Sequence, residues 1–361
     1  MITDQPASLR AVRVLYFGTY ERDYPRNAQV IACLRRAGVE VAERHVSVWE
    51  GREHKFAAGP AAAGRLLVAE LRLAARRPPA GFDAVIVGYP GHLDVPAARR
   101  AARGRPVVLN PLVSLSDTLV DDRGRFRRGS LPARALGRLD RAAFRAADLV
   151  VADTEAHAEL FRSLGARRVE VCLVGAEERV FGPGWTGGGP FLFVGKLIPL
   201  HGLETILAAA RLAPELPLRV VGSGQLESVL ADRPANVEWV RWVEYERLPG
   251  ELHGAAAALG VFGRSAKAAR VIPNKAFQAL ACGTPLVTAD TPAARELLVD
   301  GESALLVPPG DPEALAAALR RLAREPELAP RLSAGGLAVY RARASEAVLG
   351  ARWRALVESL R

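Results

Sequence analysis

Short apolar runs rich in valine, isoleucine and leucine alternate with stretches rich in alanine, leucine and arginine along the whole 361-residue chain. The apolar runs end in glycine, aspartate or asparagine, as buried strands often do, and the stretches between them have helical composition. Strands separated by helices pair in parallel, because each helix carries the chain back to the start of the next strand. The sequence therefore predicts an α/β fold built from parallel sheets.

The predicted strands form two series. The first series is Val12–Gly18, Val39–Ser47, Phe82–Tyr89, Arg105–Asn110, Asp148–Thr154 and Val169–Gly175. The second series is Phe191–Lys196, Leu218–Gly224, Val237–Val243, Ala258–Gly263, Pro285–Ala289 and Ala304–Gly310. The predicted helices include Ala28–Ala37, Glu155–Leu164, Pro312–Arg324 and Ser345–Arg361.

Residues 182–190 separate the two series with turn-forming residues and no charge. A chain of this length exceeds what one hydrophobic core organises. We expect a first domain over residues 1–182, a second over 190–340, and a helix over 345–361 that returns to the first domain. Each domain should hold a doubly wound sheet of about six strands, and such sheets bind ligands outside the carboxyl ends of their strands. The functional site should therefore lie in a cleft between the domains.

The formal net charge is +10 and comes almost wholly from arginine, since there are only four lysines: Lys55, Lys196, Lys267 and Lys275. A basic balance favours anionic partners such as nucleotides or acidic membranes. Nucleic acid is not an expected partner, because only 6% of the residues are aromatic and no groove-reading motif is present. No apolar run approaches the roughly 18 residues that span a bilayer, and the start MITDQPASLR lacks the pattern of a signal peptide. We therefore expect a cytoplasmic protein.

No metal site is predicted. The three cysteines, Cys33, Cys172 and Cys282, lie far apart in the sequence, form neither a disulfide framework nor a zinc pattern, and are expected to be buried thiols. The adjacent acids Asp121 and Asp122 lie in a basic segment rather than in a plausible metal-binding loop.

Two glycine-rich turns follow strands of the second series. GKLIPLHG, residues 195–202, leads from Gly195 into a helix, where backbone N–H groups and the helix dipole can hold a phosphate. Lys196 and His201 would add positive charge. The alternative is an ordinary strand-to-helix loop with a solvated lysine. In the second turn, VGSGQ, Gly222 and Gly224 either let a ligand approach the backbone or serve a turn that needs positive φ.

A third element is RVIPNKAFQALACGTPLVT, residues 270–288, which predicts a helix from about Lys275 to Ala281 that Gly283 ends. A lysine beside the positive end of a helix dipole is disfavoured, so an anion near Lys275 would resolve the conflict. Gln278 lies one helical turn after Asn274, and both could face the same ligand. Alternatively, Lys275 and Gln278 face solvent on an amphipathic helix.

At this order and spacing, the three elements resemble the carboxyl-terminal domain of the retaining GT-B glycosyltransferases of group 1, often called family 4. The resemblance implies a GT-B fold, in which two doubly wound, Rossmann-like parallel-sheet domains face a central cleft. It also implies a nucleoside-diphosphate sugar as the donor substrate, and we expect no cofactor and no metal. GKLIPLHG is similar to the family's diphosphate loop, with Lys196 where arginine is usual and His201 where lysine is usual.

The resemblance assigns further residues of the second domain. The segment VEWVRWVEYERLP would receive the nucleotide base around Trp242 and Val243. The family's two glutamates, spaced as Glu-x7-Glu, are replaced by Arg270 and Gln278. Gln278 can still hydrogen-bond a ribose, whereas Arg270 cannot accept a hydrogen bond, so recognition of the donor sugar must differ or Arg270 must handle the donor's charge.

Three candidates lie in the first domain. Gly18, at the end of the first strand, is similar to the family's glycine loop that faces the donor phosphate and the acceptor. His92 could lie at the cleft as a catalytic residue, or it could be a structural histidine. Asp117, in NPLVSLSDT, could act as a base for the acceptor or could simply cap a turn.

The segment Arg123–Arg145 holds eight arginines and a single acid, Asp140. It is either a solvated arginine-rich helix or a dock for an anionic membrane surface or a lipid-linked acceptor. The resulting hypothesis is a retaining glycosyltransferase that acts on a glycan, lipid-linked or small-molecule acceptor, in the cytoplasm or on the inner face of the membrane. The alternative is a catalytically weakened GT-B subunit that binds nucleotide and serves a partner, which would explain the lost glutamates.

Overall fold

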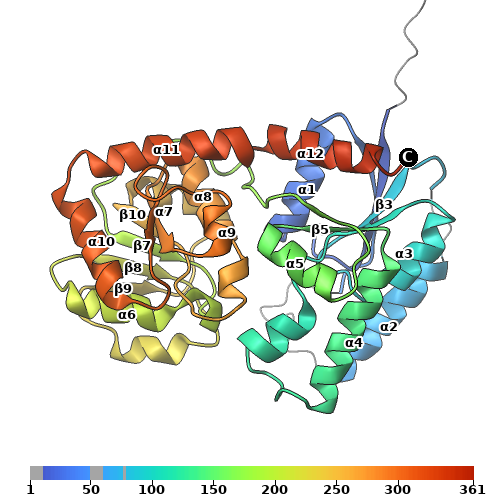
Figure 1. The fold of residues 1–361 in the computed structure, drawn as a ribbon, viewed down its shortest axis with the longest axis horizontal. Coiled ribbons are helices and arrows are strands. Elements are labelled where there is room, and N and C mark those ends of the chain that lie inside the picture. The colour runs from blue at the N-terminus through green and yellow to red at the C-terminus, as the bar shows by residue number, and fades with distance from the viewer. Residues whose placement is uncertain (1–10, 49–59, 76–78) are drawn as a thin grey trace, which may run out of the picture.

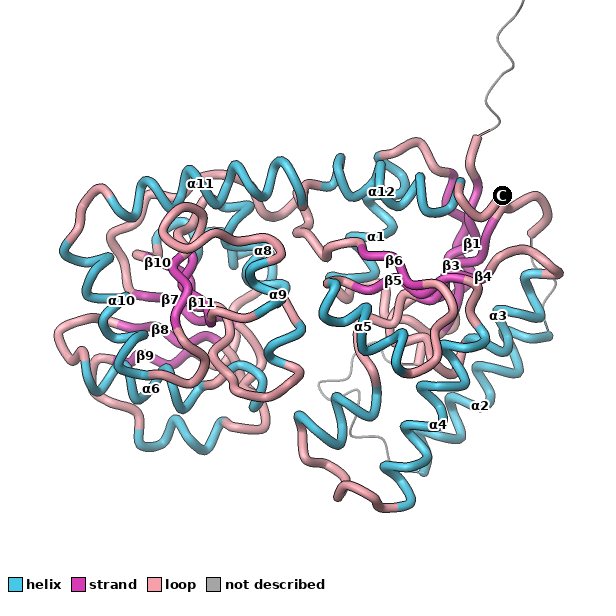
Figure 2. Tube along the Cα trace, viewed as in Figure 1, coloured by secondary structure: helices cyan, strands magenta, loops and turns pink. Residues whose placement is uncertain are grey.

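The computed structural model describes residues 11–48, 60–75 and 79–361, so Lys55 and the start of the chain, on which the expectation about a signal peptide rested, lie outside the described residues. Two six-stranded parallel sheets lie in two lobes, and helices flank both sheets (Figures 1 and 2). The predicted α/β architecture with two doubly wound sheets is confirmed, and each observed strand overlaps a predicted one.

The first sheet has the order β2-β1-β3-β4-β5-β6. Its strands are β1 (Arg13–Gly18), β2 (Glu40–His45), β3 (Ala84–Val87), β4 (Val107–Leu109), β5 (Leu149–Ala152) and β6 (Val169–Val171). The helical segments around it are α1 (Pro25–Arg36), α2 (Pro60–Ala75), α3 (Val95–Ala102), η1 (Asp117–Asp122), α4 (Leu131–Ala146) and α5 (Glu155–Ser163). The direction of the strand order changes between β1 and β3, and such a switch point is where sheets of this kind bind ligands.

The second sheet has the order β12-β11-β10-β7-β8-β9, with its switch point between β7 and β10. Its strands are β7 (Phe191–Val194), β8 (Leu218–Val221), β9 (Val237–Val240), β10 (Ala257–Leu259), β11 (Leu286–Ala289) and β12 (Leu305–Val307). Its helices are α6 (Leu203–Leu212), α7 (Leu248–Gly254), α8 (Asn274–Cys282), α9 (Pro292–Arg295) and α10 (Pro312–Arg324). Short 3-10 turns are η2 (Pro199–His201), η3 (Glu227–Asp232), η4 (Tyr245–Arg247) and η5 (Ala268–Arg270).

Two consecutive helices, α11 (Leu328–Arg343) and α12 (Glu346–Glu358), run along one side of both lobes. Figure 1 shows α11 over the second lobe and α12 over the first. Trp353 of α12 is completely buried against the first domain, where the guanidinium of Arg26 lies 5.8 Å from the centre of its ring. Burial of a tryptophan is worth several kcal/mol, so it fixes α12 on the first domain.

The segment between the two domains packs against the second domain. Within residues 182–190, the backbone N–H of Gly184 donates to Cys282 and that of Gly189 donates to Gly254. The Trp185 indole donates to the carbonyl oxygen of Ala255 over 2.8 Å. All three cysteines are buried and unpaired, as predicted. Among the described residues, no helix is both long enough and apolar enough to cross a membrane.

Candidate functional site

The segments that follow β4, β5 and β10 meet between the domains, at the carboxyl ends of their strands. The hydroxyl of Thr154, directly after β5, donates to the carbonyl oxygen of Arg270 over 2.6 Å. Arg270 in turn reaches across the cleft, where its guanidinium lies 3.0 Å from Oδ1 of Asp117 at the start of η1. The structure thus brings together two predicted site residues that stand 153 positions apart in the sequence.

Asp117 and Arg270 lie on the wall of a cleft of about 570 Å³, whose lining also includes Asp121, Arg128 and Lys267. Asp117 is only 6% exposed, and its second oxygen, Oδ2, is buried without a hydrogen-bond partner among the described residues. A buried acceptor without a donor is costly, so Oδ2 is available to a ligand hydroxyl that enters the cleft.

Lys267 crosses the same interface. Its ammonium donates to the hydroxyl of Thr118, and its side chain is buried. Burial lowers the pKa of Lys267 to about 8, although the nearby carboxylates of Asp122 and Asp117 act to raise it. The sequence shows Lys267 only as one of four lysines, and only the fold shows that carboxylates of the other domain face it.

The glycine turns of the second domain lie against each other. Gly195, Gly222 and Gly224 have φ values of 145°, 147° and 151°, which side chains rarely adopt. A Cβ atom on Gly222 would collide with the carbonyl oxygen of Gly195, and one on Gly224 would lie 2.8 Å from that of Leu197. The glycines therefore serve positive φ and the close packing of the two turns. Close approach of a ligand is not needed to explain them.

Lys275 lies with its amine 3.5 Å from the centre of the Phe193 ring, next to Gly195. The amine is buried and has no hydrogen-bond partner among the described residues, and burial holds its pKa well below the ordinary value. The alternative that Lys275 faces solvent is therefore wrong, and the prediction of an anion beside it stays a prediction. Burial thus disfavours the charged form of Lys275, in the same direction as the dipole of α8.

His201 does not add the positive charge that we expected from the sequence. Its ring is 8% exposed, Nδ1 bonds to the carbonyl oxygen of Lys196, and the ring packs edge-on against Phe193. Burial, with the nearby Lys275, holds the pKa of His201 well below its usual value. His201 therefore orders the turn as a neutral ring. Lys196 is exposed at the end of β7 and remains the candidate cation of this loop.

The other predicted donor-site residues occupy different environments. Gln278 is 8% exposed on α8 and Trp242 is 71% exposed, whereas Val243 is partly buried against the core. The N-cap of α8 is Pro273 without a side-chain hydrogen bond, so Asn274 is the first helical residue and does not cap the helix.

Two predicted residues of the first domain are held within it. Gly18 has a φ of 133°, and a Cβ atom there would collide with the carboxylate of Asp94, which accepts hydrogen bonds from the backbone and hydroxyl of Thr19. His92 is 2% exposed, and its Nε2 lies 3.4 Å from Asp140 of α4. Burial lowers the pKa of His92, which fits a neutral structural ring better than a catalytic residue at the cleft.

Asp140, which the sequence marks only as the single acid in a basic segment, organises the loop before η1. Its carboxylate is completely buried and accepts hydrogen bonds from the backbone of Leu115 and from the backbone and hydroxyl of Ser116. Among the described residues, no group of three or more histidines, cysteines or acids is placed to hold a metal ion.

Comparison with known proteins identifies the family. Residues 7–177 match the description "Glycosyl transferase 4-like domain", and residues 189–325 match "Glycosyl transferases group 1". Together the two matches cover most of the chain. The chain belongs to the group 1, family 4 type glycosyltransferases.

Curated relatives match over part of their length. A phosphatidyl-myo-inositol mannosyltransferase of Mycobacterium leprae is 32% identical over 43% of this chain and 42% of its own. A D-inositol 3-phosphate glycosyltransferase of Kribbella flavida is 32% identical over 54% of this chain and 52% of its own. The matches thus span about half of these relatives.

Solved structures share the whole fold at low identity. Sucrose-phosphate synthase (tll1590) from Thermosynechococcus elongatus is 17% identical, with a TM-score of 0.75 over 97% of this chain and 99% of that one. Anabaena Alr3699/HepE in complex with UDP-glucose is 16% identical, with a TM-score of 0.65 over 97% and 99% of the two chains. The predicted GT-B fold is confirmed.

Proposed function

We propose that this protein transfers a sugar from a nucleoside-diphosphate donor to a hydroxyl group of an acceptor, with retention of the anomeric configuration. The observation that carries the proposal is the cleft in which Asp117 of the first domain meets Arg270 of the second, at the carboxyl ends of both sheets. Chemistry on two substrates needs residues of both domains in one place, and this cleft supplies them. The complex of the HepE structure with UDP-glucose supports a donor of this class.

The cations of the second domain would stabilise the departing diphosphate, where the largest negative charge develops. Lys196 is exposed just after β7, and beside the same turn Lys275 holds a buried amine that has no hydrogen-bond partner among residues 11–48, 60–75 and 79–361. An arriving diphosphate would favour the charged form of Lys275 and turn an unpaired polar group into an ion pair. Gln278 would bind the ribose, and the backbone near Trp242 and Val243 would receive the base.

On the acceptor side, Asp117 would take the proton of the attacking hydroxyl. Its Oδ2 is buried and receives no hydrogen bond within the described part of the chain, while Oδ1 is held by Arg270. The ion pair with Arg270 fixes the orientation of the carboxylate, so Oδ2 is held in one position from which it would accept the proton. Arg270 would in addition contact the donor's sugar or phosphate.

We propose that transfer requires no metal ion, because the adjacent acids of η1 already have cationic partners. The carboxylate of Asp121 lies 2.8 Å from Arg128, and that of Asp122 lies near Lys267 and Arg123. Turnover that survives EDTA supports this part of the proposal, and turnover that is lost with EDTA and restored by Mg²⁺ or Mn²⁺ overturns it.

We further propose that the enzyme works in the cytoplasm and docks reversibly on the inner face of the membrane. Seven of the eight arginines of Arg123–Arg145 are exposed, and Leu131 at the start of α4 is 80% exposed. Each arginine near an acidic surface contributes about 1 kcal/mol. Sedimentation with anionic but not with neutral vesicles at low salt would support this docking, and equal sedimentation with both would contradict it.

The test of the main proposal is a calorimetric titration with UDP, GDP and ADP, followed by incubation of the matching sugar nucleotides with candidate acceptors. We expect one nucleotide to bind, a product heavier by one sugar residue in mass spectrometry, and the donor's anomeric configuration in the NMR spectrum of that product. A protein that binds none of the nucleotides is not a transferase of this kind. A product with the inverted anomeric configuration would overturn only the proposed retention and would leave the proposed sugar transfer intact.

The replacement of both family glutamates by Arg270 and Gln278 favours one alternative, a nucleotide-binding subunit with weakened catalysis. The same titration separates the two functions. Tight nucleotide binding without turnover of the bound sugar nucleotide, alone and with acceptors, would support the subunit, whereas turnover would exclude it.

A further inference from the structure

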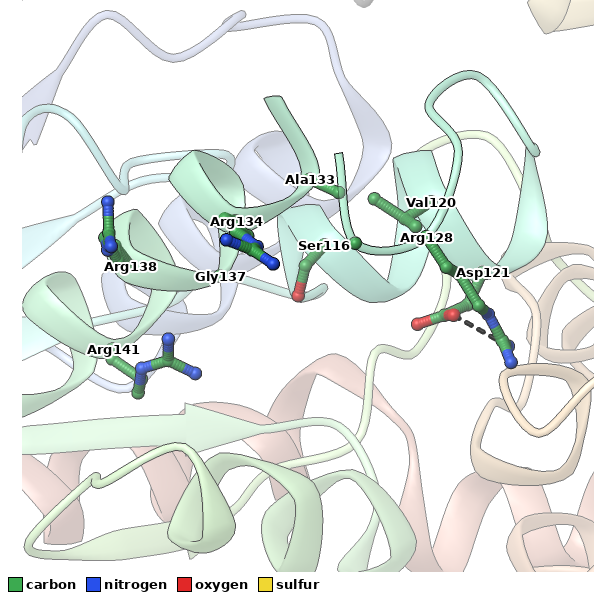
Figure 3. Close-up of a pocket in the computed structure, with 10 residues that line it drawn as sticks. Ser116, Val120, Asp121, Arg128, Ala133, Arg134, Gly137, Arg138 and Arg141 are labelled. Carbon is green, nitrogen blue, oxygen red and sulfur yellow. Dashed lines mark ion pairs between the residues drawn. The ribbon is translucent and has the colours of Figure 1, made fainter. Parts of the chain in front are cut away.

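An arginine-lined groove lies beside the cleft, between η1 and α4. It has a volume of about 520 Å³ and includes Arg128, Arg134, Arg138 and Arg141, together with Ser116 and Asp121. We call it the arginine groove. Figure 3 shows the three arginines of α4 on one side of Ser116 and the ion pair of Arg128 with Asp121 on the other side.

The sequence of α4 places its arginines in a row. Arg134, Arg138 and Arg141 are four and three residues apart, which puts them on one face of the helix. Gly137 lies among them, and a Cβ atom there would lie 3.8 Å from the guanidinium nitrogens of Arg141. The missing side chain leaves the space between the arginines open along the groove.

The charges of this row are not neutralised. Asp140, the only acid in the segment, is turned inward and accepts hydrogen bonds from the loop before η1. Within the described part of the chain, Arg134, Arg138 and Arg141 have no acidic partner, whereas Arg128 pairs with Asp121. Like charges one helical turn apart destabilise a helix, so an anion in the groove would relieve their repulsion.

The groove continues into the catalytic cleft. Asp121 and Arg128 line both the groove and the cleft, and the cleft also contains Asp117. A molecule that is anchored in the groove can therefore extend past the Asp121–Arg128 pair toward Asp117. Because this pair is exposed, it adds little stability and can rearrange around a ligand.

We propose that the arginine groove binds a phosphate group of the acceptor, so that the acceptor is a phosphorylated hydroxyl compound held with its reacting hydroxyl at Asp117. This inference rests on the proposed function and names its acceptor class. A guanidinium group binds phosphate by paired hydrogen bonds. A phosphate group has several oxygens and up to two negative charges, so three arginines can bind it together. The phosphate belongs either to a soluble ester or to a lipid headgroup.

The test compares two triple variants with the same loss of charge. The groove variant is Arg134→Gln, Arg138→Gln, Arg141→Gln. The control variant is Arg125→Gln, Arg127→Gln, Arg145→Gln, which changes exposed arginines of the same segment that are not among the groove's lining residues. Both are titrated by calorimetry with inorganic phosphate, glycerol 3-phosphate and D-inositol 3-phosphate, with and without UDP or GDP.

We expect at least one of these probes to bind the wild type, the groove variant to bind it roughly tenfold or more weakly, and the control to stay within about threefold. Equally weakened affinity for the probes in both variants would show a general effect of charge and would overturn the proposed phosphate site. A wild type that binds none of the probes would also overturn it. Thermal unfolding checks the fold, and we expect no loss of stability in the groove variant because repulsion is removed.

Vesicles separate the two sources of phosphate. If the ligand is a lipid headgroup, the groove variant loses more binding to vesicles with phosphatidylinositol than the control does, because both variants lose the same general attraction to an acidic surface and only the groove variant also loses the headgroup site. Equal losses in the two variants would contradict a headgroup site. If the ligand is a soluble ester, only the titrations with soluble probes respond to the groove changes. Nucleotide affinity is measured in parallel. A wild type that binds no nucleotide would refute the proposed transferase function. A groove variant with unchanged affinity for both nucleotide and phosphate would refute only the proposal that the groove binds phosphate.

Discussion

Replacing Arg270 by Met and Asp117 by Asn, singly and together, measures how strongly the two domains are coupled at the cleft. The charges lie 3.0 Å apart, and at an effective dielectric constant of about 20 their attraction is on the order of 5 kcal/mol. Burial offsets much of it, since the side chains of Arg270 and Asp117 are only 26% and 9% exposed. We expect a coupling free energy of about 1–3 kcal/mol.

The assay is urea unfolding, monitored by tryptophan fluorescence and far-UV circular dichroism. The unfolding free energies of the four proteins in the cycle are compared only if their slopes against urea concentration are equal. Arg270→Met alone should cost more stability than the double variant, because it leaves the buried carboxylate of Asp117 without its guanidinium partner. The exposed pair Asp290–Arg295 gives a matched control cycle, with an expected coupling below about 1 kcal/mol. A coupling at the cleft no larger than in this control would refute the argument.

Three further outcomes are expected. Lys196→Ala should lower turnover roughly 10²-fold while thermal unfolding stays within a degree or two of the wild type, because the side chain is exposed and acts on the leaving diphosphate; near-normal turnover would remove Lys196 from the site. Gln278→Ala should mainly weaken nucleotide binding, and an unchanged affinity in calorimetry would show that this amide does not hold the ribose. Burial lowers the pKa of Lys267 to about 8 in the folded protein, so the unfolded chain binds more protons above that pH. The stability of the wild type relative to Lys267→Met should therefore rise by about 1.5 kcal/mol from pH 8 to pH 9.5, and a constant difference would show that Lys267 keeps its ordinary pKa.

The strands and the glycines at their ends were predictable from the sequence. A strand that is buried on both faces needs a continuous apolar run, and this requirement is local, so each observed strand overlaps a predicted one. The residues at which the strands end were less predictable. The predicted strand Val169–Gly175 is regular only over Val169–Val171, because its last residues leave the sheet and enter the connection between the domains.

The chemistry of single side chains was less predictable, because it depends on what surrounds them. The sequence pattern suggested a charged His201 and a solvated or anion-paired Lys275. In the folded protein, His201 and the amine of Lys275 are both buried beside Phe193 of β7. Burial costs a charged group its hydration and lowers the pKa of both. For His92 the sequence left a catalytic and a structural role open, and its contacts with Asp140 and Phe144 of α4 fit the structural role.

The sequence by itself determined the two doubly wound domains, the family and the list of residues that could carry the chemistry, because each depends on local composition or on short motifs. Only the tertiary structure decided which of these residues meet. Asp117 and Arg270 face each other across 153 positions, and Asp140 turns inward and leaves three arginines of α4 without an acidic partner among the described residues. Such pairings are decided by how helices and loops of separate domains pack, and burial then sets whether each charge is compensated, neutralised or left for a ligand.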